Sequence, residues 1–119
     1  MTEYGIYYIY CMCIIKYIYL ISDYDSYKIG ISKNEPSKRM KALQTGSSVE
    51  LQIVNVFRSK YANILEKTLH RTYNLEHKRG EWFYLTQPQV DNFLLECDKI
   101  EKTFIELEKS DNNFFKKML

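Results

Sequence analysis

The chain has 119 residues, of which 45% are apolar and 27% charged, a length that suits one globular domain and is too short for two. With only four Gly and two Pro, collagen-like, low-complexity and wholly disordered classes are excluded. The net charge of +2 hides an asymmetry, because residues 28–79 hold eleven Lys and Arg against four acidic residues. A basic middle segment is typical of a face that binds a polyanion such as nucleic acid, although a solvated helix surface has the same composition.

The three cysteines do not indicate a disulfide scaffold, since Cys11 and Cys13 are too close to bridge each other and Cys97 is left over. A zinc site that combines them with His70 and His77 is disfavoured, because the Cys-x-Cys and His-x6-His spacings do not match common zinc ligands. We expect the cysteines to fill the core. The N-terminus shows no secretory signal, so an intracellular location in the cytoplasm or nucleus is expected.

Residues 4–21 form an almost uninterrupted apolar and aromatic run. Its many tyrosines and Lys16 disfavour a transmembrane helix, so no membrane association is expected. Its β-branched and aromatic residues favour strands instead. Residues 16–21 and 27–31 flank the polar segment 22–26, which predicts a hairpin with a five-residue loop.

Capping residues and apolar periodicity predict three helices and two further strands downstream. Asn34 as N-cap, Pro36 in the first turn and Gly46 as a stop predict a helix over residues 35–45. An alternating apolar run then predicts a buried strand, and apolar residues spaced by three or four predict a second helix. A short aromatic segment follows, and Gln87-Pro88 opens the last helix. These four elements are expected at residues 50–57, 60–76, 81–85 and 87–109.

The predicted order is β-β-α-β-α-β-α in one domain over residues 1–119. Residues 1–15 are expected to form an added strand or N-terminal extension, and residues 110–119 a frayed tail. The expected fold class is α+β, with a central antiparallel sheet flanked by helices and an added C-terminal helix.

Five short motifs occur in a definite order between residues 17 and 83. They are Tyr17-Ile18-Tyr19, Lys28-Ile29-Gly30, Arg39, Glu66-Lys67-Thr68-Leu69-His70 and Gly80-Glu81-Trp82-Phe83. In this order the chain resembles the GIY-YIG nuclease superfamily, and more closely the branch of phages and large DNA viruses whose second motif reads Lys-Ile-Gly. The resemblance covers residues 17–85 and implies a small GIY-YIG-like domain that acts as an endonuclease on DNA.

The resemblance also implies a role for each motif. Glu66 would be the ligand of one Mg²⁺ (or Mn²⁺), a hard cation whose other ligands are water and phosphate oxygens. Arg39 would hold the scissile phosphate with its bidentate fork. Tyr19 would deprotonate or position the attacking water, with Lys28 as nearby positive charge, since free tyrosine has a pKa of ~10. His70, on the same helical face as Glu66, would orient water or bind phosphate.

Two departures from the superfamily pattern bear on the chemistry. Lys28 replaces the second-motif tyrosine, and Tyr27 beside it faces the other side of the strand by alternation, so a phenol is lost there. The letters Gly5-Ile6-Tyr7 occur early, with twenty residues between Tyr7 and Lys28 against eight between Tyr19 and Lys28. Tyr19 is therefore preferred as the first-motif tyrosine, and Tyr7 is the rival.

Lys33, Lys38 and Lys41 lie just before or within the helix predicted at residues 35–45 and are the candidate DNA contacts. No small-molecule cofactor is implied, and the oligomeric state is left open. The competing interpretation is a catalytically impaired module of the same fold that binds nucleic acid or a protein partner. The presence of both Arg39 and Glu66 favours the nuclease, because a module that only binds needs no carboxylate in its basic surface, where it repels phosphate unless a metal intervenes.

Overall fold

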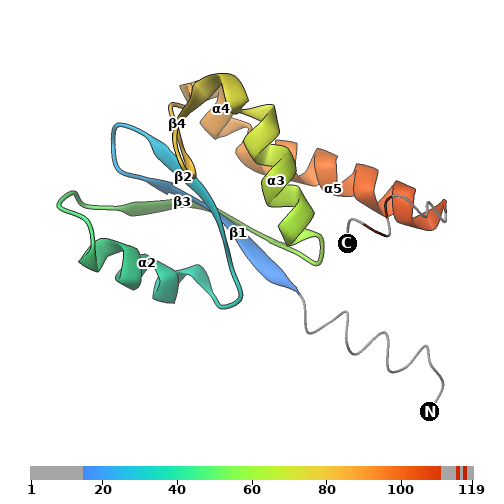
Figure 1. The fold of residues 1–119 in the computed structure, drawn as a ribbon, viewed down its shortest axis with the longest axis horizontal. Coiled ribbons are helices and arrows are strands. Elements are labelled where there is room, and N and C mark those ends of the chain that lie inside the picture. The colour runs from blue at the N-terminus through green and yellow to red at the C-terminus, as the bar shows by residue number, and fades with distance from the viewer. Residues whose placement is uncertain (1–14, 111–114, 116, 118–119) are drawn as a thin grey trace, which may run out of the picture.

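The structure is a computed structural model that describes residues 15–110, 115 and 117. In chain order its elements are β1 (Lys16–Ser22), β2 (Tyr27–Ser32), α2 (Pro36–Thr45), β3 (Gln52–Ser59), α3 (Ala62–Thr72), a 3-10 turn (Asn74–Glu76), β4 (His77–Arg79), β5 (Trp82–Phe83), α4 (Gln87–Asp91) and α5 (Phe93–Lys109). The described strands form one five-stranded antiparallel sheet in the order β3-β1-β2-β5-β4 (Figure 1). The predicted α+β class with a C-terminal helix is confirmed.

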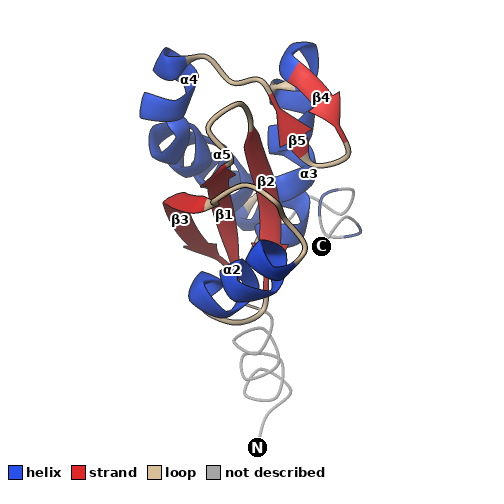
Figure 2. Cartoon of the chain, turned by 90° about the vertical axis from the view of Figure 1, so that its left-hand side faces the viewer, coloured by secondary structure: helices blue, strands red, loops and turns tan. Residues whose placement is uncertain are grey.

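The sheet separates α2 from α3 and α5, which cover its other face (Figures 1 and 2). Alternation along β1 produces the two layers, because successive side chains of a strand point to opposite faces. Ile18 and Leu20 belong to the main core with α3 and α5. Tyr19 and Ile21 belong to a smaller cluster with side chains of α2. The central strands are therefore buried on both faces, which explains their nearly continuous apolar sequence.

The hairpin at residues 16–31 forms as predicted, and its loop is stabilised from within. The carboxylate of Asp23 accepts hydrogen bonds from the backbone N–H groups of Asp25 and Ser26, at 3.0 and 2.6 Å. The Ser26 hydroxyl donates to the same carboxylate at 3.1 Å. A single aspartate thus satisfies the polar groups of the turn, as side chains of this type commonly do.

Several element boundaries differ from the sequence prediction. Glu35, not Asn34, is the N-cap of α2, and β3 begins at Gln52 rather than residue 50. The prediction that this strand is buried was wrong, because β3 lies at the edge of the sheet and most of its side chains are exposed. The helix predicted over residues 87–109 is divided into α4 and α5 at Asn92. The break follows from residue type, since asparagine competes for backbone hydrogen bonds and favours helix ends.

Strand β4 was not predicted, because the apolar repeat of α3 appeared to run to residue 76. The helix ends at Thr72, and the chain turns into a hairpin with β5. Gly80 supplies the positive φ, +56°, that this tight turn needs. His77 stabilises the pairing with an edge contact to Phe83, 5.3 Å between ring centroids. Tertiary pairing therefore overrides the local helical pattern here.

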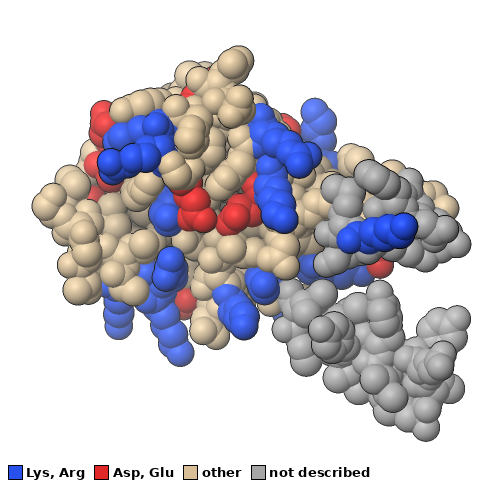
Figure 3. Space-filling model, in the orientation of Figure 1, with Lys and Arg blue, Asp and Glu red and all other residues tan. Residues whose placement is uncertain are grey.

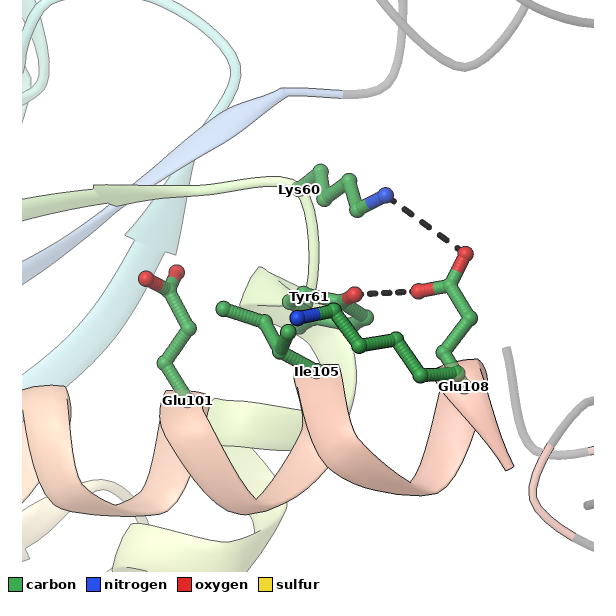
Figure 4. A pocket seen from close by; sticks show the side chains of 6 residues that line it. Lys60, Tyr61, Glu101, Ile105 and Glu108 are labelled. Carbon is green, nitrogen blue, oxygen red and sulfur yellow. Dashed lines mark hydrogen bonds and ion pairs between the residues drawn. The ribbon is translucent and has the colours of Figure 1, made fainter.

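The C-terminal helix is attached to the β3–α3 turn around a cavity of ≈ 430 Å³. Tyr61 donates a hydrogen bond to Glu108, and the Lys60 Nζ lies 3.5 Å from the same carboxylate (Figure 4). Burial and the bond to Glu108 raise the pKa of Tyr61. Because these polar groups satisfy one another, we assign the contact a structural role.

The two chain ends lie largely outside the described residues, and so do the added strand predicted at residues 1–15, Cys11, Cys13 and the rival tyrosine Tyr7. Of the predicted frayed tail, Phe115 is described and is 3% exposed, stacked on Phe104 at 5.5 Å. Cys97 is fully buried in the main core, as a core-filling cysteine would be. Among the helices of the described part, none has the length and apolarity to cross a bilayer.

Candidate active site

Glu66 lies on α3 beside the stripe that packs on the sheet. Leu65 and Leu69 of that stripe are fully buried, so the adjacent Glu66 is drawn into a half-buried position. Its Oε2 atom is buried and has no hydrogen-bond partner among the described residues. Burial is the main cause that raises the pKa of Glu66, and the nearby charge of Glu81 adds to it, whereas His70, Lys28 and Lys67 act in the opposite direction.

Lys28 and Glu81 form an ion pair next to Glu66. The Lys28 Nζ lies 2.7 Å from the Glu81 Oε2, and the two side chains are 12% and 37% exposed. Lys28 pairs with Trp82 across β2 and β5, and its ammonium lies 5.8 Å from the centre of the Trp82 ring. The residue at the second-motif position is thus held by a carboxylate and an aromatic face, and both contacts suit a cation.

His70 lies one turn after Glu66 and contacts the edge of β2. Its Nε2 lies 2.9 Å from the Ile29 carbonyl oxygen; a carbonyl only accepts, so Nε2 carries a proton, while Nδ1 makes no hydrogen bond to the described residues. The Ile29 N–H donates to the Glu81 carbonyl at 3.0 Å. Both backbone groups of a residue in an antiparallel strand point to the same edge. Ile29 therefore brings α3 and the Glu81 segment together at one point.

Tyr19 approaches this point from the α2 side of the sheet. It pairs with Gly30 across β1 and β2, and its ring and hydroxyl occupy the space that a Cβ of Gly30 would need. The side chain is 1% exposed. Its hydroxyl makes no hydrogen bond within the described part of the chain. The end of Tyr19 thus lies against β2 one residue from Ile29, where His70 and Glu81 are attached.

Gly30→Ala is expected to destabilise the fold by about 1–3 kcal/mol, because the new methyl group would displace the Tyr19 ring in a closely packed cluster. Chemical denaturation measures the change. Gly46→Ala is the matched control, since a Cβ there meets only the Leu43 carbonyl at 3.8 Å. Equal losses for the two variants would contradict the packing of Tyr19 over Gly30.

Arg39 and the three candidate DNA contacts form a basic strip on α2 and just before it. Arg39, Lys38 and Lys41 are exposed on α2, and Lys33 is exposed in the loop before it. Helix α2 lies on the other side of the sheet from α3 (Figure 1). Arg39 forms no ion pair within the described residues. The structure thus brings Glu66, Lys28 and His70 together, and it places Arg39 on the helix that covers the other face of the sheet.

Glu81 is the residue of this cluster to which sequence reasoning gave no role. It was quoted only as part of Gly80-Glu81-Trp82-Phe83, and its acidic side chain in a basic region was the available signal. In Figure 3 acidic side chains lie side by side at the centre of one face, with basic side chains around them. In such an arrangement a cation could link the acidic side chains to a polyanion.

The Glu66 carboxylate fits the cation that the resemblance implies. An oxygen that is buried and unpartnered is a suitable ligand for a hard divalent ion. Within the described residues, no group of three or more His, Cys, Asp or Glu is arranged to hold a metal. A bound Mg²⁺ would therefore take most of its ligands from water and from the phosphate of a substrate.

Comparison with known proteins places these features in a family. A search of curated proteins and a search of solved structures found no match. A family model, the T5orf172 domain, matches residues 16–98, from the first residue of β1 into α5. This range includes Glu66, Lys28, His70 and Glu81. The chain therefore belongs to the T5orf172 domain family, a phage-associated domain of the GIY-YIG/HNH-like endonuclease type.

Proposed function

We propose that the chain is a Mg²⁺-dependent endonuclease that hydrolyses DNA phosphodiester bonds at the Glu66 site. The observation that carries the proposal is the buried oxygen of Glu66, which has no partner in the described part of the chain, beside the cationic Lys28. Such an oxygen costs folding free energy unless a ligand satisfies it, so its presence in a nuclease-type family supports a metal site. Bound Mg²⁺ would supply a Lewis acid for the phosphate and lower the pKa of its water.

Each neighbouring residue has a role in this proposal. Tyr19 would position the attacking water, or take its proton, through the hydroxyl at Gly30. Lys28 would exchange part of its contact with Glu81 for a phosphate oxygen as charge develops there. His70 would accept a hydrogen bond from water at Nδ1, because Nε2 is engaged by Ile29.

The basic strip on α2 would bind the DNA backbone. Lys33, Lys38 and Lys41 would neutralise phosphates, so binding would weaken as salt increases. Arg39 is our candidate for the scissile phosphate. For the basic strip on α2 and the Glu66 site to bind the same DNA strand, that DNA strand would run from α2 across the edge of β2 to Glu66.

Nicking of a supercoiled plasmid in Mg²⁺ or in EDTA tests the proposed activity. We expect nicking in Mg²⁺ and none in EDTA. Arg39→Ala and Arg39→Lys should each lower the rate by about 10-fold or more, since lysine cannot reproduce the guanidinium fork. Arg58→Ala is the control, because it removes the same group from an exposed position of β3. Nicking that persists in EDTA would contradict the metal requirement.

The second candidate function is DNA binding without cleavage. The Lys28–Glu81 ion pair favours it, because Lys28 stands in place of a tyrosine and its charge is already paired. Salt-sensitive binding to DNA with no nicking in either Mg²⁺ or Mn²⁺ would select this function over the nuclease.

A further inference from the structure

A cavity of ≈ 320 Å³ lies on the α2 side of the sheet. It is bounded by the end of α2, the β1–β2 loop and the β4–β5 hairpin. The lining residues that bear on its chemistry are Leu43, Leu51, Trp82, Lys78, Arg79 and Asp23. Its volume lies at the lower end of the ~300–1,000 Å³ that is usual for small-molecule sites. The cavity therefore suits one small group rather than a large ligand.

The inner wall of this cavity is apolar and partly aromatic. Leu51 is 5% exposed and packs with Leu43 and Trp82 in the same cluster as Tyr19. This packing holds the indole in place, so its ring can serve as a stacking surface. Bases of unpaired nucleic acid bind aromatic side chains in this manner, largely independently of sequence.

The outer wall carries two cations on the β4–β5 hairpin. The Lys78 Nζ lies 3.4 Å from Asp25 and 5.3 Å from the centre of the Tyr84 ring. Arg79 has no ion-pair partner among the described residues. The hairpin that presents it is held by His77, whose Nε2–H donates to the Gly80 carbonyl at 2.8 Å. Arg79 is thus available to bind a phosphate with its fork.

The charge of Asp23 favours entry of the base of a nucleotide into the cavity over entry of its phosphate. Burial opposes its ionisation, but the hydrogen bonds from Ser26 and Asp25 outweigh it and lower the pKa of Asp23. A carboxylate that stays charged repels a phosphate inside the cavity. A neutral base inside, with its phosphate outside at Arg79, avoids this repulsion.

The cavity adjoins the candidate active site through Trp82. The indole that lines it pairs with Lys28 across β5 and β2, and Lys28 is bound to Glu81. A strand whose phosphate lies at Glu66 therefore has a route for a neighbouring base into the cavity.

We propose that this cavity binds one unpaired nucleobase of DNA by stacking on Trp82, with Arg79 on the attached phosphate. The inference rests on the proposed function for its choice of DNA, and it specifies the substrate class as DNA that is single-stranded or locally unpaired. A fully paired duplex keeps its bases stacked and cannot fill the cavity without paying for base extrusion.

Fluorescence tests this proposal, because Trp82 is the only tryptophan of the chain. The probes are a single-stranded DNA 10-mer and its blunt duplex, both in EDTA so that no cleavage occurs. We expect the single strand to quench Trp82 and to bind about 10-fold or more tightly than the duplex. Arg79→Ala should weaken single-strand binding by about 10-fold and leave duplex binding nearly unchanged.

Two comparisons make the outcome decisive. Arg58→Ala removes an exposed arginine on β3 and should weaken the binding of both DNA probes slightly and to the same extent. Absence of quenching, or an equal effect of Arg79→Ala on both probes, would overturn the base site even if the plasmid is nicked in Mg²⁺. Quenching with the expected selectivity supports the site even if no nicking occurs, so the two proposals fail separately.

Discussion

Glu66→Gln is expected to reduce Mg²⁺-dependent nicking by at least about 100-fold while leaving DNA binding in EDTA nearly unchanged. The amide has the size of the carboxylate but lacks the charge that would hold a divalent cation. The measurements are the initial rate of plasmid nicking and the affinity for a labelled oligonucleotide. Glu101→Gln is the matched control, since it removes the same charge from a partly buried glutamate of α5.

The same variant is expected to be more stable than the parent at neutral pH without metal. Folding raises the pKa of Glu66, chiefly by burial, so the folded chain binds this proton more readily than the unfolded chain. The free energy of unfolding then falls as the pH rises from the unfolded-state pKa through the folded-state pKa. Gln imitates the protonated side chain. The gain in stability of Glu66→Gln over the parent should therefore be full above the folded-state pKa of Glu66 and vanish below pH ~4.

Thermal unfolding in EDTA measures this gain, expected at about 2–5 °C at neutral pH. Mg²⁺ should raise the midpoint of the parent and not that of Glu66→Gln, because only a ligand that binds the folded state stabilises it. If Mg²⁺ does not change the thermal unfolding midpoint of the parent, the metal site is contradicted by a measurement that does not depend on activity. Nicking that survives in Glu66→Gln would remove Glu66 from the proposed chemistry.

Tyr19→Phe is expected to reduce nicking by about 100-fold, with the fold intact, if its hydroxyl handles the attacking water. The ring packs against Gly30 and the α2-side cluster, and phenylalanine keeps that packing. The hydroxyl has no hydrogen-bond partner in the described part of the chain, so its removal should change the free energy of unfolding by less than about 0.5 kcal/mol.

Tyr7→Phe is the comparison that decides between the two tyrosines. If Tyr19 is the first-motif tyrosine, the Tyr7→Phe variant should nick the plasmid at the rate of the parent. The opposite result, full activity in Tyr19→Phe and loss in Tyr7→Phe, would transfer the role to Tyr7. Circular dichroism and denaturation of both variants exclude unfolding as the cause.

The predicted hairpin, the helix over residues 35–45 and the α+β class were all readable from local patterns. Alternation also placed Lys28 and Tyr27 on opposite faces of β2, and the structure agrees, since Tyr27 packs on the main core while Lys28 pairs with Glu81. These features depend on residues within a few positions of one another. Strand β4 was not predicted, because its partner β5 is itself held by the distant strand β2. The break at Asn92 was also missed, although asparagine favours helix ends.

The sequence by itself determined the order of the elements from β1 to α3, the excess of basic residues in the middle of the chain and the presence of an acidic residue among them. Only the tertiary structure decided that Glu81 binds Lys28, that a buried oxygen of Glu66 has no partner among the described residues, and that α2, with Arg39, lies on the other side of the sheet from α3. The reason is physical: strand alternation and helix periodicity are local, whereas a charge pair or a desolvated carboxylate depends on which distant segments meet.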